Sequence, residues 1–99
     1  KMDLYRRRFT MDISRFTALA NMYSEAASKV IESQNQLKAS VESNGEKWVG
    51  EKREKFDQKY QEIQLAYSNY AQELMNTSAA LRSAAIQIEK IYNELVHGK

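Results

Sequence analysis

The side chains that could do chemistry in this sequence are few and scattered. His97 is the only histidine, and there is no cysteine, so neither a zinc–thiolate site nor a thiol nucleophile can form. No nucleophile with a base, no glycine-rich phosphate loop and no isolated carboxylate pair can be assembled from the remaining residues. We therefore expect no catalytic residue, no metal and no cofactor, and the sequence predicts a protein that is not an enzyme.

Trp48 is the only tryptophan and is followed two positions later by Gly50. A large ring beside a bend can close the open end of a pair of helices, and a glycine lets the backbone pass close to that ring. The residues alone therefore predict a structural plug at this point.

The start of the chain is basic, with three consecutive arginines at Arg6, Arg7 and Arg8. Residues 1–10 carry a net charge of +3, and residues 11–99 carry a net charge of −1. Such an arm could contact nucleic acid or an anionic membrane surface. The commoner role is a solvated face or a cover for Glu89 and Glu94, so we do not expect nucleic acid as a partner.

The composition favours long helices. There is no proline and there are only three glycines, so 44 residues precede Gly45 and 47 separate Gly50 from Gly98 without a residue that interrupts a helix. An all-β fold would need a turn every 8 to 12 residues. No apolar run approaches the roughly 18 residues that cross a bilayer. The predicted class is all-α.

Apolar residues follow a strict alternation of three and four, which is typical of helices that wrap around one another. In the first half the pattern is interrupted only by Gln34, and in the second only by Thr77. Each polar residue either fixes the register of the paired helices or is a hydrated position that the stripe tolerates. The first stripe is Ile13, Phe16, Ala20, Tyr23, Ala27, Val30, Gln34, Leu37 and Val41. The second is Phe56, Tyr60, Ile63, Tyr67, Tyr70, Leu74, Thr77, Leu81, Ala84, Ile88, Ile91 and Leu95.

We expect one domain over residues 1–99, with helix 1 at about 12–43, a bend at 44–50, helix 2 at about 51–96, and residues 1–10 as a basic extension. Asn44 and Gly45 are suited to a left-handed turn at the end of helix 1. Ser43 and Glu46 compete with this as a capping box for helix 2. The short connection predicts an antiparallel helical hairpin.

The position of the bend also predicts which residues of the two helices face each other. We expect Tyr23 opposite Tyr70 and Ile13 roughly opposite Leu81. The end of helix 2 is then covered only if residues 2–10 continue helix 1, which would bring Phe9 alongside, or if another chain covers it. We favour a partial continuation, since helix 1 can begin at Thr10 or Asp12 or as early as Asp3.

A hairpin leaves half of each wide apolar face in water, and pairing two hairpins into a four-helix bundle covers it. We expect a homodimer or a pair with another helical protein. The expected partner interface consists of Ile13, Phe16, Tyr23, Val30, Leu37, Ile63, Tyr67, Tyr70, Leu74, Leu81, Ile88 and Ile91.

The chain resembles the WXG family of small type VII secretion substrates, the relatives of the early secreted antigenic target. The resemblance rests on a length of about one hundred residues, long apolar repeats, Trp48-Val49-Gly50 at a bend, and Phe56 eight residues after the tryptophan. The resemblance covers about residues 13–95. It implies a dimeric four-helix bundle, secreted without a classical signal peptide or cytoplasmic before export. It implies a secreted virulence factor, or a helical partner for the N-terminal domain of a larger toxin, with the secretion ATPase as a further partner. In that family the bend also contributes to a docking element, so Trp48 and Gly50 are candidates for docking as well as for a plug.

Two features depart from the family pattern. The family's export signal, Tyr-x-x-x-Asp/Glu, is not found in these 99 residues, because Val96 stands four residues after Tyr92. The signal either lies beyond the end of this sequence, is supplied by a partner or is absent. A typical member would begin near Met11, so residues 1–10 are additional. The missing signal favours the accessory partner over an independently secreted factor. The alternative from another class is a small helical protein that binds DNA or a membrane surface through its basic arm.

Overall fold

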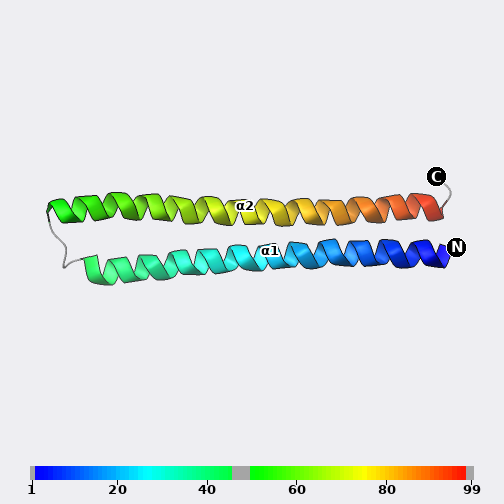
Figure 1. The fold of residues 1–99 in the computed structure, drawn as a ribbon, viewed down its shortest axis with the longest axis horizontal. Helices are drawn as coiled ribbons and strands as arrows, with labels where there is room; N and C mark the ends of the chain where they lie inside the picture. The colour runs from blue at the N-terminus through cyan, green and yellow to red at the C-terminus, as the bar shows by residue number, and fades with distance from the viewer. Residues whose placement is uncertain (1, 46–49, 98–99) are drawn as a thin grey trace. The chain divides into compact units, whose positions relative to one another are not determined.

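The computed structural model describes residues 2–45 and 50–97, and within these residues all regular secondary structure is helical. Helix α1 spans Met2–Asn44 and helix α2 spans Glu51–Val96. The two helices run antiparallel and pack against each other as a hairpin (Figure 1). The prediction of an all-α hairpin is confirmed. Trp48, the expected plug, lies outside the described residues.

The chain divides into two compact units, which we describe separately. One consists of Lys1–Glu25 with Met75–Lys99, and we call it the terminal unit. The other is the continuous segment Ala26–Leu74, which contains the bend, and we call it the bend unit. Each unit holds a portion of α1 against a portion of α2 (Figure 1).

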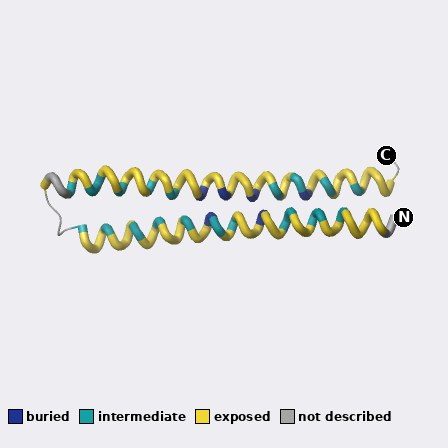
Figure 2. The backbone as a smooth tube through the Cα atoms, viewed as in Figure 1, coloured by how far each residue is buried: buried dark blue, intermediate teal, exposed yellow. Residues whose placement is uncertain are grey.

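Small side chains fill the contact between the helices. In the terminal unit Ala20, Ser78 and Ala85 are buried, and in the bend unit Ala27, Ala71 and Leu74 are buried (Figure 2). Among the described residues none of the large side chains is fully buried. Alanine and serine at these positions let two helix backbones approach closely, so the core is narrow and its largest side chains lie at its margins.

Polar groups bond across this narrow core in the terminal unit. Ser78 Oγ lies 2.8 Å from the carbonyl oxygen of Ala20 and 2.7 Å from Ser24 Oγ. Because Ser78 donates its hydroxyl hydrogen to the carbonyl, Ser24 donates to Ser78. At the surface, Arg82 Nη2 donates to Asn21 Oδ1 at 2.8 Å.

The bend unit has a second set of polar contacts. Gln34 Nε2 donates to the carbonyl oxygen of Gln64 at 3.3 Å and to Ser68 Oγ at 2.9 Å. Gln64 Nε2 in turn donates to the carbonyl oxygen of Gln34 at 3.4 Å. Gln34 therefore spans the two helices with bonds of its own, whereas Thr77, the other polar member of the expected stripes, is exposed.

The predicted stripe is largely right for α1 and half right for α2. On α2 the half-buried or buried positions include Tyr60, Tyr67, Leu74, Leu81 and Ile88, as expected. Most of the intervening positions are wrong, because the next residue along the chain is the more buried one. The residues in contact are Gln64, Ala71, Ser78, Ala85 and Tyr92, in place of Ile63, Tyr70, Thr77, Ala84 and Ile91. Of the residues replaced, Ile63, Tyr70, Thr77 and Ile91 are exposed, and Ala84 is half-buried.

The predicted facing of residues is also wrong. Tyr23 is expected opposite Tyr70, but its neighbour Ser24 bonds to Ser78. Arg82 bonds to Asn21, whereas the expected register places residue 13 close to this part of α2. The observed register brings the small residues Ser24 and Ser78 into contact, whereas the expected register follows from a turn centred near residues 46 and 47. The shift along α2 is about one and a half to two and a half helical turns.

Helix α1 begins at Met2, not near Asp12, so residues 2–10 are helical. Phe9 lies against Tyr92, with ring centroids 5.5 Å apart, and Arg6 Nε donates to the Tyr92 hydroxyl at 3.1 Å. Continuation of the helix is favourable because these contacts with α2 anchor it. Phe9 therefore lies alongside the end of α2 as expected, although Ile91 and Leu95 remain exposed.

Candidate functional site

The start of α2 at the bend is determined by Gly50. Its φ of +71° is in the left-handed region, and within the described residues it is the only positive φ. Its carbonyl oxygen accepts bonds from the backbone nitrogens of Arg53 at 3.1 Å and Glu54 at 3.2 Å, which close the first turn of α2. A glycine is favoured here because a Cβ atom would strain this backbone.

The two sequence motifs expected at the bend are not those that form. Asn44 and Gly45 do not have the left-handed φ expected of them. Ser43 does not begin a capping box for α2, because it lies inside α1 and its hydroxyl donates to the carbonyl oxygen of Ser40 at 3.1 Å. The left-handed residue stands instead at Gly50, immediately before α2.

Arg53 closes the carboxyl end of α1. Its Nε donates to Asp57 Oδ1 at 3.1 Å and Oδ2 at 3.2 Å, and its Nη1 donates to the carbonyl oxygen of Gly45. A cation at the end of a helix satisfies a free carbonyl and the helix dipole together. This role of Arg53 was not expected from the sequence, because Arg53 lies in a run of charges of mixed sign that is typical of a solvated surface. The signal that could have found it is the heptad spacing of Arg53 and Asp57 with Tyr60.

A small cavity of about 130 Å³ lies beside this arginine. Its walls come from the last two turns of α1 and the first turns of α2. They are Ser40, Val41, Asn44, Gly45, Arg53, Phe56 and Asp57. Phe56 is half-buried and stacks on Tyr60, with ring centroids 6.0 Å apart. Gly50 thus lies at the bend and Phe56 in the second turn of α2, while Trp48 is not described.

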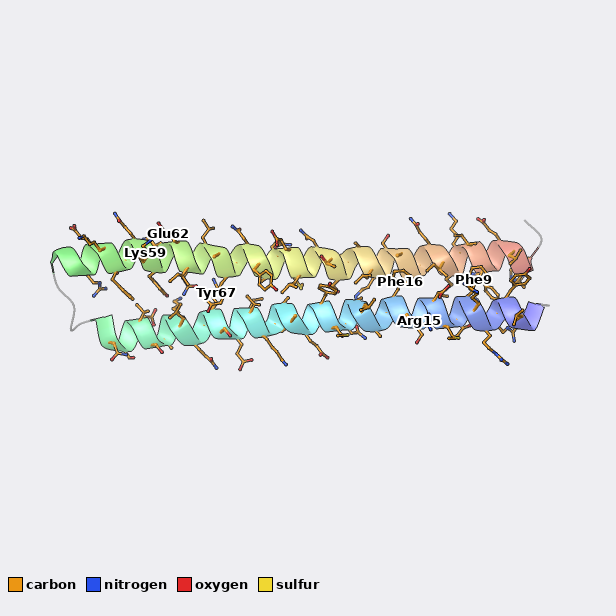
Figure 3. All side chains as sticks on the ribbon, in the orientation of Figure 1. Phe9, Arg15, Phe16, Lys59, Glu62 and Tyr67 are labelled. Carbon is orange, nitrogen blue, oxygen red and sulfur yellow. The ribbon has the colours of Figure 1, made fainter. Side chains whose placement is uncertain are left out.

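The residues expected at the partner interface fall into two groups. One group is half-buried or buried in the contact between the helices and consists of Ile13, Phe16, Val30, Leu37, Tyr67, Leu74, Leu81 and Ile88. The side chain of Phe16, like that of Phe9, lies between α1 and α2 (Figure 3). The other group is exposed, with exposed fractions of 37% for Tyr23, 46% for Ile63, 55% for Tyr70 and 54% for Ile91. The second group is therefore the more accessible to another molecule.

The described surface offers exposed apolar side chains for contact with another molecule. No group of three or more His, Asp or Glu side chains is arranged to hold a metal ion in residues 2–45 and 50–97. Neither helix has, in its described part, a stretch apolar enough to span a membrane. The described residues form a helical hairpin with exposed apolar positions, which places the chain in the class of small all-helical proteins.

Comparison with known proteins places the chain within this class. The sequence model of the family described as "Proteins of 100 residues with WXG" matches residues 8–91, a span that contains Trp48, Gly50 and Phe56. The chain belongs to the WXG100 family, whose association with type VII secretion is known. A protein of Bacillus subtilis (strain 168), "Uncharacterized protein YfjA", is 40% identical over 80 residues, which cover 81% of this chain and 77% of that protein. No solved structure matches significantly.

Proposed function

We propose that this chain is a non-enzymatic component of a bacterial type VII secretion system that acts by pairing its hairpin with a second helical hairpin. The favoured partner is a second copy, which would complete a four-helix bundle. The alternative partner is the helical N-terminal domain of a larger secreted toxin. Membership of the WXG100 family, whose members form dimers or pair with other proteins, supports this assignment.

The observation that carries the proposal is the accessible surface of the single chain, which is 7995 Å². A folded monomer of 11.5 kDa typically exposes about 5,800 Å². The excess of about 2,200 Å² matches what each partner contributes to a large permanent interface, since such interfaces bury roughly 2,000–5,000 Å² in total. A second hairpin would remove this excess.

The exposed apolar residues on α2 suggest where the second hairpin packs. Ile63, Tyr70 and Ile91 share one heptad position and are each about half exposed. On α1, Leu19 and Tyr23 are exposed at 42% and 37%. We assign the partner interface to these residues, because burying a large apolar side chain gains about 1.5–3 kcal/mol.

Sedimentation equilibrium tests the pairing. At micromolar concentration we expect a mass about twice 11.5 kDa for the unaltered chain. Tyr70→Lys with Ile91→Lys should give monomers, because each lysine places a charge in an apolar interface. Gln61→Lys with Gln87→Lys adds the same charge at exposed polar positions and should leave the dimer intact. If the unaltered chain is monomeric and also fully helical by circular dichroism, the proposal of a homodimer is overturned.

The secretion role needs a separate experiment in the producing cell. If the chain is an accessory partner, its deletion should abolish export of the larger protein, and Tyr70→Lys with Ile91→Lys should do the same without lowering expression. Export that is unchanged in the deletion strain would exclude this role. If the deletion abolishes export and the chain itself is also found outside unaltered cells, the chain is a secreted factor.

A further inference from the structure

The outer side of α1 in the terminal unit carries a stripe that neither the contact with α2 nor the proposed dimer interface uses. Leu4 and Ile13 are nine residues apart, as are Met11 and Ala20, and nine residues are two and a half turns of a helix. Because Ile13 and Ala20 are covered by α2, Leu4 and Met11 lie on the opposite side of α1. We call this stripe the outer α1 stripe, and its six members are Leu4, Arg8, Met11, Arg15, Ala18 and Met22.

The outer α1 stripe repeats with alternating steps of four and three residues and is exposed throughout. Its large apolar members are unusually accessible, with 71% of Leu4, 46% of Met11 and 62% of Met22 exposed. Spacing of this kind presents a continuous seam to another helix. From Leu4 to Arg15 the seam alternates apolar and basic residues, and it ends in the apolar Ala18 and Met22, so it is not an ordinary apolar packing surface.

Charge is concentrated along the same surface. An open groove on α1 is lined by Leu4, Tyr5, Arg7, Arg8, Met11, Asp12 and Arg15. Three arginines and one carboxylate give it a net charge of +2. Arg7, Arg8 and Arg15 form no hydrogen bond or ion pair with any other group in the part of the chain that the structure describes. Their guanidinium groups are thus available to carboxylates of another molecule, for which their planar geometry is suited.

We propose that the outer α1 stripe docks an acidic amphipathic helix of a partner protein. Apolar residues of that helix pack on Leu4, Met11 and Met22, and its Glu or Asp side chains pair with Arg8 and Arg15. The stripe shares no residue with the proposed dimer interface, which borders it at Leu19, and Leu4 precedes the residues that the WXG100 family model matches.

The arrangement of the residues favours a helix over the other anionic partners. A helix that lies on a membrane keeps its apolar residues on one face and its basic residues on the other, whereas here they alternate along one stripe. Nucleic acid would pair with the arginines through phosphates but would leave Leu4 and Met22 in water. Only a partner that also alternates apolar and acidic groups satisfies both kinds of side chain.

The test uses the full chain and three synthetic helical peptides that differ at the positions facing the arginines. One peptide has Glu there, one has Gln and one has Lys, with the same apolar residues in all three. Fluorescence anisotropy at low salt should show binding of the Glu peptide only. Arg8→Glu with Arg15→Glu should weaken that binding by about tenfold or more and allow the Lys peptide to bind.

Controls separate this surface from general charge effects and from the dimer. Lys38→Glu with Lys90→Glu makes the same change in net charge at exposed positions elsewhere and should change binding by less than about twofold. Both double variants should remain dimers, so failure here would leave the proposed function untouched. Equal binding of the Glu and Gln peptides would overturn the proposal. So would tighter, arginine-dependent binding of phosphatidylserine-containing vesicles or of duplex DNA, which would assign the surface to a membrane or to nucleic acid.

Discussion

Ser78 of α2 donates a hydrogen bond from its hydroxyl to the main-chain carbonyl oxygen of Ala20 in α1, over 2.8 Å. That carbonyl also belongs to the hydrogen-bonding pattern of its own helix. A serine side chain is short, so it can reach the backbone of a neighbouring helix only when the two helices are close. The bond therefore identifies the point of close approach in the terminal unit.

Ser78→Ala should destabilise the protein by about 1–2 kcal/mol, because the buried hydroxyl bonds both Ala20 and Ser24. In a domain of this size the melting temperature should fall by about 4–8 °C for each kcal/mol. Urea unfolding at fixed protein concentration measures the change. Ser83→Ala, at an exposed position on the same helix, is the matched control and should differ from the unaltered protein by less than about 0.5 kcal/mol.

Gly50→Ala should cost about 1–2 kcal/mol, because alanine must adopt the φ of +71°. No other atom lies within 4 Å of the added Cβ position, so the cost comes from the backbone alone. Gly50→Asn should cost less, since asparagine tolerates the left-handed region.

Gly45→Ala provides the comparison for Gly50. At Gly45 the nearest group to an added Cβ is the flexible end of Arg53, at 3.2 Å, and φ is not positive. We expect a change smaller than that of Gly50→Ala in the same urea experiment. Equal costs at the two glycines would show that the left-handed conformation is not what makes Gly50 important.

Phe9→Ala should loosen the first turns of α1 without unfolding the rest. The ring of Phe9 packs on Tyr92 and is the main aromatic anchor of this segment. Amide hydrogen exchange of residues 4–10 should become faster, while exchange around the buried Ala20 and Ala27 should stay unchanged. Faster exchange at Ala20 as well would mean that the start of α1 and the centre of the helix open together.

The sequence predicts the helices more accurately than their contact. The long intervals without proline or glycine predict the two helices, and Gly50 is correctly expected at the bend. The stripe on α2 is misplaced because apolarity favours Tyr70 over Ala71, whereas close packing favours the smaller residue. Side-chain size matters more than apolarity where two backbones meet, and a search for large apolar residues overlooks this.

The roles of individual polar residues were harder to predict. Gln34 is recognised as an interruption, but its bonds to Gln64 and Ser68 depend on the register, which the bend alone does not determine. Arg53 resembles its charged neighbours in sequence, and only the positions of Gly45 and Asp57 give it a capping role. The start of α1 depends on the contact of Phe9 with Tyr92, which is 83 residues away.

The narrow core has a consequence for how the protein responds to temperature. Among the described residues the buried ones are alanines, one serine and one leucine, so unfolding of a single hairpin exposes less new apolar surface to water than unfolding of a globular domain of the same length. The heat-capacity increment of unfolding scales with that surface. We expect the stability of a lone hairpin to vary gently with temperature and its calorimetric transition to be broad, with the sharper transition of a globular domain emerging only when a second hairpin is bound.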